Sequence, residues 1–181
     1  MKTLTALLCL FALAAHAGAP DPSARNVELL EQYYALGKAR EHEKQAVMWA
    51  PDAINLGRPV QHDSVRVAIE DIHRTFPDYH SEVLETRASG DTVAQMSRMS
   101  GTHRGMAQTA IFGGLLKDAP PTGKRFEVLV THWWRFNESG KIMWHQVTRD
   151  DLGMYLQLGL LPGRLPTASP STEKGTSPVK D

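Results

Sequence analysis

Apolar residues recur at helical spacing in the first part of the chain, for example at Val27, Leu30 and Tyr34. A Pro-Ser start signal, a break at Ala50-Pro51-Asp52 and a stop at Pro77 separate the helical stretches. The pattern predicts three helices, over about residues 22–36, 41–49 and 63–76.

Beyond residue 78 the pattern changes to the alternation of β-strands, with turn signals at Ser89-Gly90-Asp91 and at residues 137–140. The alternating segments are residues 79–86, 92–103, 125–136 and 141–149. Helices followed by a run of antiparallel strands make an α+β domain. We therefore expect a curved antiparallel sheet whose helices cover part of one face, which leaves room for a cavity.

The two ends of the chain differ from this domain. Lys2 and an apolar run from Leu4 to Ala15 precede small residues, which is typical of a secretory signal peptide over residues 1–17, with cleavage after residue 19 as the alternative. The run is too short for a membrane anchor. Residues 162–181 are rich in Pro, Ser, Thr and Gly and are predicted to be a disordered tail. The domain is then residues 20–161 of a periplasmic or secreted protein.

Composition narrows the chemistry that such a domain supports. The 181 residues are 41% hydrophobic, which is enough for one core, and Lys+Arg and Asp+Glu are 20 each. A formal charge of zero gives no reason to expect nucleic acid as a partner. Cys9 is the single cysteine and lies in the predicted signal peptide, so cleavage would leave no thiol for disulfides, catalysis or zinc.

Residues 125–149 read as a hairpin with a histidine on each arm. We expect Phe136 to pair with Lys141 across a two-residue turn. This register sets His132 directly opposite His145 on one face. It also pairs Trp133 with Trp144 and Val130 with Val147. A slip of one residue would send the two histidines to opposite faces.

The face that holds His132 is otherwise apolar. It also carries Val128, Val130, Trp134 and Phe136. A cavity lined by aromatic residues with few polar groups is the usual form of a small-molecule site. The alternative is that the tryptophans fill the core and that His132 is a hydrogen-bonded interior residue.

Seven short pieces follow one another along the domain. They are Ala50-Pro51-Asp52, Phe76-Pro77-Asp78, Gly90-Asp91, Gly101-Thr102-His103, Pro121-Thr122-Gly123-Lys124, Arg135-Phe136 with Gly140-Lys141-Ile142, and Asp150-Asp151-Leu152-Gly153 leading to Gln157-Leu158-Gly159. Together they resemble the SnoaL-like polyketide cyclase and ester cyclase family, of the nuclear transport factor 2-like superfamily. The resemblance implies a cone in which a curved antiparallel sheet and the N-terminal helices enclose a pocket.

Family cyclases close a ring by an aldol-type step without metal or organic cofactor, using a His and an Asp on the last two strands. The resemblance places His132 and His145 at family histidines and Asn55 at a polar pocket position. Val147 occupies the place of the acid/base aspartate, and valine neither accepts a proton nor donates to an oxyanion. A two-histidine catalytic site is the chemistry that remains.

The other residues expected to contact a ligand are His103, Trp134 and Phe136, beside Asn55 and Val147. A metal site that joins His103 to the hairpin histidines is not expected, because none has a short-range ligand partner such as His-x-His. Because the resemblance is to cyclases that work without metal or organic cofactor, we expect no cofactor.

The expected function is that of an exported protein with a small apolar or aromatic ligand, acting as a cofactor-free cyclase, isomerase or hydrolase. The alternative is a non-catalytic ligand-binding or assembly module on the same fold, which Val147 favours. Residues 104–123 are longer than a normal strand connection and form either a lid or a dimer contact. A homodimer is expected through the outer sheet face, where Trp133 and Trp144 would otherwise be exposed.

Overall fold

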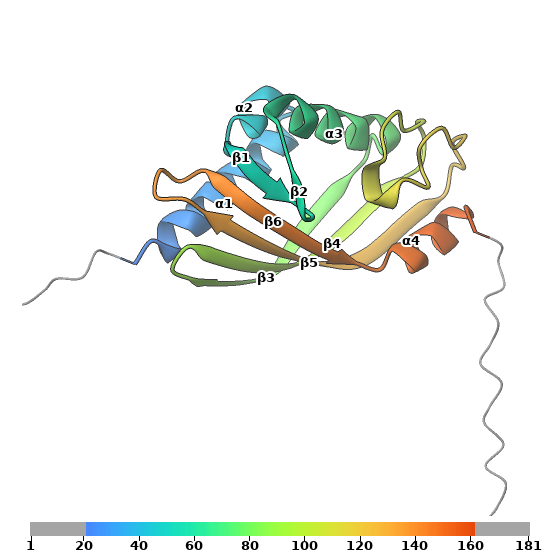
Figure 1. Cartoon of the computed structure of the whole chain (residues 1–181). Helices are drawn as coiled ribbons and strands as arrows, with labels where there is room; N and C mark the ends of the chain where they lie inside the picture. Colours follow the sequence, from blue (N-terminus) through green and yellow to red (C-terminus); the bar gives the residue numbers. More distant parts are fainter. Residues whose placement is uncertain (1–20, 162–181) are drawn as a thin grey trace, which may run out of the picture.

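The computed structural model describes residues 21–161, so the predicted signal peptide and tail lie outside the described residues. Six strands form one curved, unclosed sheet in the order β2-β1-β6-β5-β4-β3. Helices α2 and α3 and the segment that follows β4 lie over the same side of this sheet (Figure 1). The elements are α1 (Ser23–Lys38), α2 (His42–Ala46), β1 (Trp49–Asn55), β2 (Arg58–Pro59), α3 (His62–Thr75), β3 (His80–Ser89), β4 (Thr92–Thr102), η1 (Ile111–Gly113), β5 (Arg125–Phe136), β6 (Ile142–Arg149) and α4 (Asp151–Leu158).

The predicted α+β class is confirmed, but the sheet is mixed rather than wholly antiparallel. Four of the five strand pairings are antiparallel, whereas β1 runs parallel to β6. The sequence pattern assigned Trp49 to a helix and the following Ala-Pro-Asp to a break, so it missed β1. Pro51 fits in this strand because the register between β1 and β6 is irregular from Trp49 to Ile54.

Local capping explains the helix boundaries. Gln61 N donates a hydrogen bond to Ser64 Oγ (3.1 Å), so α3 begins one residue before the predicted start. The spacing of apolar residues, whether compared with a helical or a strand period, does not predict α4. Asp150 caps this helix by accepting a hydrogen bond from Gly153 N (2.8 Å). Gly159 ends α4 in a left-handed conformation. Among residues 21–161, no helix has the length and apolar composition needed to cross a bilayer.

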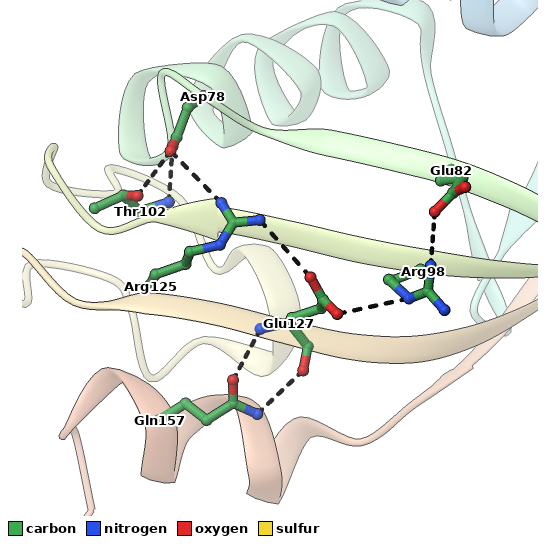
Figure 2. Close-up of polar contacts among 7 residues, drawn as sticks. All are labelled: Asp78, Glu82, Arg98, Thr102, Arg125, Glu127 and Gln157. Atoms are coloured by element: carbon green, nitrogen blue, oxygen red, sulfur yellow. Dashed lines mark hydrogen bonds and ion pairs between the residues drawn. The ribbon is translucent and has the colours of Figure 1, made fainter.

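Helix α4 covers the part of β5 that β6 leaves unpaired, since β6 pairs only with residues 130–136. The side-chain amide of Gln157 accepts a hydrogen bond from Glu127 N (2.8 Å) and donates one to Glu127 O (3.1 Å). Figure 2 shows this contact beside a ladder of ion pairs that joins β3, β4 and β5. The amide takes the place of a neighbouring strand and thereby protects an open sheet edge.

The buried apolar residues form two clusters rather than one. The first includes Leu30, Tyr33, Trp49, Ala53, Val65, Val93, Trp134 and Phe136. The second includes Phe76, Met99, Ile111, Leu116, Phe126, Val130, Met154 and Tyr155. Along β4, the buried polar residues Gln95 and Ser97 lie between Val93 of the first cluster and Met99 of the second. The inner sheet face is therefore polar where the two clusters meet.

Residues 104–123 are anchored to α3 through Asp71. This carboxylate is fully buried and accepts hydrogen bonds of 2.7 to 3.1 Å from Gln108 N and from Thr109 N and Oγ1. The segment also buries Ile111 and Leu116 in the second cluster. These contacts hold residues 104–123 against α3 and the second cluster, which accounts for the defined position of so long a connection.

Candidate active site

The two hairpin histidines share the inner face of the sheet, but they are not direct cross-strand partners. His132 pairs with Val147, and His145 pairs with Trp134. The expected register, with His132 opposite His145 and Val130 opposite Val147, is therefore wrong by two residues. Because side chains alternate with a period of two, an even shift keeps both imidazoles on one face.

The shift originates at the turn. Asn137 N donates to Lys141 O and Gly140 N donates to Asn137 O (both 2.9 Å), so the turn is longer than the expected two-residue turn. A bulge between the last two residues of β5 precedes this turn. The expected opposition of Trp133 and Trp144 is wrong for the same reason, since Trp133 faces a glutamine and Trp144 faces an arginine.

Asn55, His145 and His132 form a continuous hydrogen-bonded chain. Asn55 Oδ1 lies 2.9 Å from His145 Nδ1, and His145 Nε2 lies 3.0 Å from His132 Nδ1. The parallel pairing of β1 with β6 sets Asn55 directly beside His145. The strand that the sequence pattern missed thus supplies the third member of the chain.

This chain fixes the tautomer of each ring. Because a carboxamide oxygen only accepts hydrogen bonds, His145 carries its proton on Nδ1 and offers a lone pair on Nε2. His132 then donates through Nδ1 and keeps the lone pair on its own Nε2. Within residues 21–161, His132 Nε2 has no hydrogen-bond partner. The nitrogen left for a ligand is therefore a proton acceptor.

Burial keeps both imidazoles neutral. Desolvation, and after it the positive charge of Arg149, lowers the pKa of His132 to about 4. Desolvation, and after it repulsion from His132, holds the pKa of His145 well below its usual range. Both rings are therefore uncharged at pH 7, which the tautomers of the hydrogen-bonded chain require.

Indole rings fix the positions of the imidazoles. Trp134 stacks on His145 with ring centroids 3.8 Å apart and an angle of 19° between the planes. Trp49 meets His145 edge-on at 6.0 Å. Trp134 is only 3% exposed and Phe136 is buried in the same cluster, so both predicted contact residues also belong to the core.

His103 does not join the histidine pair. It follows β4 immediately, eight residues beyond Gln95, the residue of β4 that lies opposite His132. Eight strand residues span roughly 26 Å. The His103 ring is fully buried against Phe76, with centroids 5.7 Å apart, and its Nδ1 lies 3.3 Å from Thr122 Oγ1. The expectation that His103 borders the same site is wrong, because most of the length of β4 separates His103 from His132.

Gln95 and Tyr34 belong to the site, although the sequence pattern did not single them out. Gln95 lies opposite His132 and is 4% exposed. Tyr34 Oη donates to Gln95 Oε1 (2.9 Å), and burial raises the pKa of Tyr34 above its usual value, which keeps this donor protonated. The available signal was a polar residue at an inward position of an otherwise apolar strand.

Two hollows on the surface of the protein include no predicted site residue. One of about 480 Å³ is lined by residues 40–44 with Arg66 and Glu70, and one of about 390 Å³ lies along α1. Within residues 21–161, no group of three or more His, Cys, Asp or Glu side chains is placed to hold a metal ion.

Comparison with known proteins identifies the family. The family model of SnoaL-like polyketide cyclases matches residues 27–158, which is most of the chain. The chain belongs to this family. No curated protein matches it.

Solved structures of SnoaL-like and related proteins share the fold. AclR from Streptomyces galilaeus is 24% identical with a TM-score of 0.61, over 77% of this chain and 99% of AclR. A SnoaL-like polyketide cyclase from Agrobacterium tumefaciens is 16% identical with a TM-score of 0.61, over 74% and 98% of the two chains. An NTF2-like protein from Burkholderia thailandensis is 22% identical with a TM-score of 0.53, over 71% and 92%. Identities this low show the fold alone.

Proposed function

We propose that this SnoaL-like protein is a cofactor-free cyclase or isomerase in which His132 Nε2 removes a proton from a carbon acid. The observation that carries the proposal is the hydrogen-bonded chain from Asn55 through His145 to His132. That chain leaves a lone pair on His132 Nε2, the nitrogen of the histidine pair that has no hydrogen-bond partner among residues 21–161.

The first step forms an enolate. A C–H bond beside a carbonyl breaks, its proton passes to His132 Nε2, and its electron pair moves into the enolate. The new imidazolium is stabilised because its Nδ1–H donates to His145 Nε2, while His145 donates to Asn55. A pKa of about 4 makes His132 a weak base, so the substrate C–H has to be acidic, as between two carbonyl groups.

The second step decides between the two reaction types. In an isomerisation, His132 returns the proton to a different carbon of the enolate. In a cyclisation, the enolate carbon bonds to a second carbonyl carbon of the same molecule, and the resulting alkoxide takes the proton from His132. Both sequences regenerate the neutral histidine and need no external reactant.

The ligand that suits these surroundings is small and mostly apolar or aromatic. The indole of Trp134 lies stacked on both imidazoles, and the two apolar clusters adjoin the polar inner face. Flat rings pack well against such a wall. Within the histidine pair, the polar contact available to such a ligand is His132 Nε2.

The second candidate is a non-catalytic ligand-binding or assembly module, and Val147 favours it. Valine lies directly opposite His132, at the position where the resemblance to family cyclases expects the acid/base aspartate. A site that lacks this carboxylate and holds its histidines by internal hydrogen bonds would suit binding without turnover.

Proton exchange separates the two candidates without knowledge of the natural substrate. An aryl β-keto ester in D₂O, followed by NMR, reports removal of its α proton. We expect the wild-type protein to accelerate exchange and His132→Gln to abolish this acceleration with little change in thermal midpoint. His80→Gln is the matched control, because His80 is exposed on β3. Equal rates for wild type and His132→Gln would leave only the binding module.

We also propose that the protein is exported to the periplasm or secreted, with the N-terminal segment removed after residue 17 or 19. The support is the apolar run and the small residues that follow it. Intact mass of the protein isolated from its native compartment tests this directly. A protein that retains Met1 would refute it.

A further inference from the structure

Arg149 places a guanidinium group on the inner face of the sheet, beside the histidine pair. It lies opposite Val130, which is 1% exposed and points inward, and cross-strand partners share a face. Arg149 is two residues beyond Val147, the partner of His132. Arg149 and His132 are thus diagonal neighbours on adjacent strands, at a separation that long side chains bridge.

The Arg149 side chain is mostly buried, but its guanidinium is only partly paired. The Arg149 side chain is 9% exposed, and its Nε donates to Asp151 Oδ1 at 2.5 Å. The centroid of the Phe112 ring lies 4.4 Å from Arg149 Cζ. Among residues 21–161, Nη1 and Nη2 have no hydrogen-bond acceptor.

A structural ion pair alone does not account for this arrangement. Arginine in such a pair usually engages a carboxylate through two parallel N–H groups, whereas Asp151 takes only Nε and is itself 44% exposed. The two Nη groups are not fully buried, and their four N–H bonds remain available to a ligand. They form a fork of the kind that binds a carboxylate.

A second unpaired polar group lies in the same cross-strand row. Ser97 is paired with Val130, the residue that Arg149 faces on its other side. Its side chain is fully buried, and Ser97 Oγ has no hydrogen-bond partner among the described residues. The next row along the strands holds Gln95 and His132. Unsatisfied polar groups therefore adjoin the proposed base on one face.

We propose that the Nη groups of Arg149 bind a carboxylate of the ligand, so that the ligand is a small aromatic or aliphatic carboxylic acid. This inference rests on the proposed function for the position of the ligand next to His132. One cation beside Asp151 suits a singly charged group, whereas a phosphate dianion would require more positive charge. The carboxylate would orient the ligand so that its acidic C–H faces His132 Nε2.

A pair of probes with and without the charge tests the proposal. We expect wild-type protein to bind 2-naphthoate more tightly than 2-naphthamide by about tenfold or more, measured by calorimetry. Arg149→Gln should remove this preference with little effect on naphthamide. Arg135→Gln is the matched control, because Arg135 lies over Trp144 on the outer face, and it should retain the preference.

Two further variants make the result independent of folding defects and of catalysis. Asp151→Asn removes the competing carboxylate and should tighten naphthoate binding several-fold, because the guanidinium loses its internal counter-charge. His132→Gln should abolish proton exchange and still prefer naphthoate. If wild type binds both probes equally or neither of them, or if Arg149→Gln keeps the preference, the carboxylate site is wrong. Loss of exchange in His132→Gln would then still support the proposed function.

Discussion

His132 and His145 are bonded diagonally across β5 and β6, with Nδ1 of the first 3.0 Å from Nε2 of the second. Their rings lie nearly parallel, at 17° and with centroids 5.3 Å apart. A diagonal contact leaves the position directly opposite His132 to Val147. The two residues are therefore successive members of one hydrogen-bonded chain. A substitution at Asn55 acts on His145, and a substitution at Val147 acts on His132.

Asn55→Asp tests the order of this chain. A carboxylate 2.9 Å from His145 Nδ1 would favour the imidazolium, so the pKa of His145 should rise from its depressed value. NMR titration of the histidine ring protons measures the change. The matched variant Asn55→Leu removes the acceptor and should destabilise the fold by about 1–3 kcal/mol, because it leaves a buried N–H unpaired. An unchanged titration of His145 in Asn55→Asp would show that Asn55 is not its partner in solution.

Much of this fold follows from residue patterns, but the site depends on features that patterns do not carry. The alternation in β5 and β6 suffices to place His132 and His145 on one face, since any even register gives that result. The true register depends on the turn at Asn137 and on a bulge, which one residue can change. Asn55 reaches His145 only through a parallel pairing between segments 90 residues apart. No local signal encodes that contact.

Fold stability should fall as pH falls below neutral. Desolvation is the first cause that lowers the pKa of both His132 and His73 to about 4, whereas an unfolded histidine titrates near 6.5. Between these values the unfolded chain binds protons that the folded chain excludes, so stability rises with pH from about 4 to about 6.5 and then levels off. Urea titrations across this range measure the slope.

His132→Gln should flatten this pH dependence, because it removes one of the groups with a depressed pKa. His80→Gln changes an exposed histidine and should leave the slope as it is. The charges that act on His132 come from Arg149, and those on His145 come from His132. A slope in His132→Gln that equals the wild-type slope would mean that His132 is protonated as readily in the folded chain as in the unfolded one.

The homodimer expected through the outer sheet face stays a prediction. Its centre differs from the expected one, because Trp133 and Trp144 do not face each other. Trp133 is 47% exposed, and Leu129 on the same strand is 55% exposed, which leaves an apolar surface open to water. We expect Trp133→Ala to weaken association by about tenfold or more in sedimentation equilibrium at micromolar concentration. Leu152→Ala, at an exposed position on α4, is the control. Monomeric wild-type protein would refute the prediction.

Val147→Asp tests whether the site retains the geometry of a two-residue acid/base pair. The new carboxylate would lie directly opposite His132, so the pKa of His132 should rise from about 4 and the imidazole should become a stronger base. Proton exchange from the aryl β-keto ester should then accelerate, at a cost in stability of roughly 1–3 kcal/mol for the partly buried charge. Val147→Asn has the same shape without the charge, so it should carry a similar stability cost and no gain in rate. If the aspartate variant folds, raises the pKa of His132 and still shows no faster exchange, the histidine chain binds ligands without acting on them.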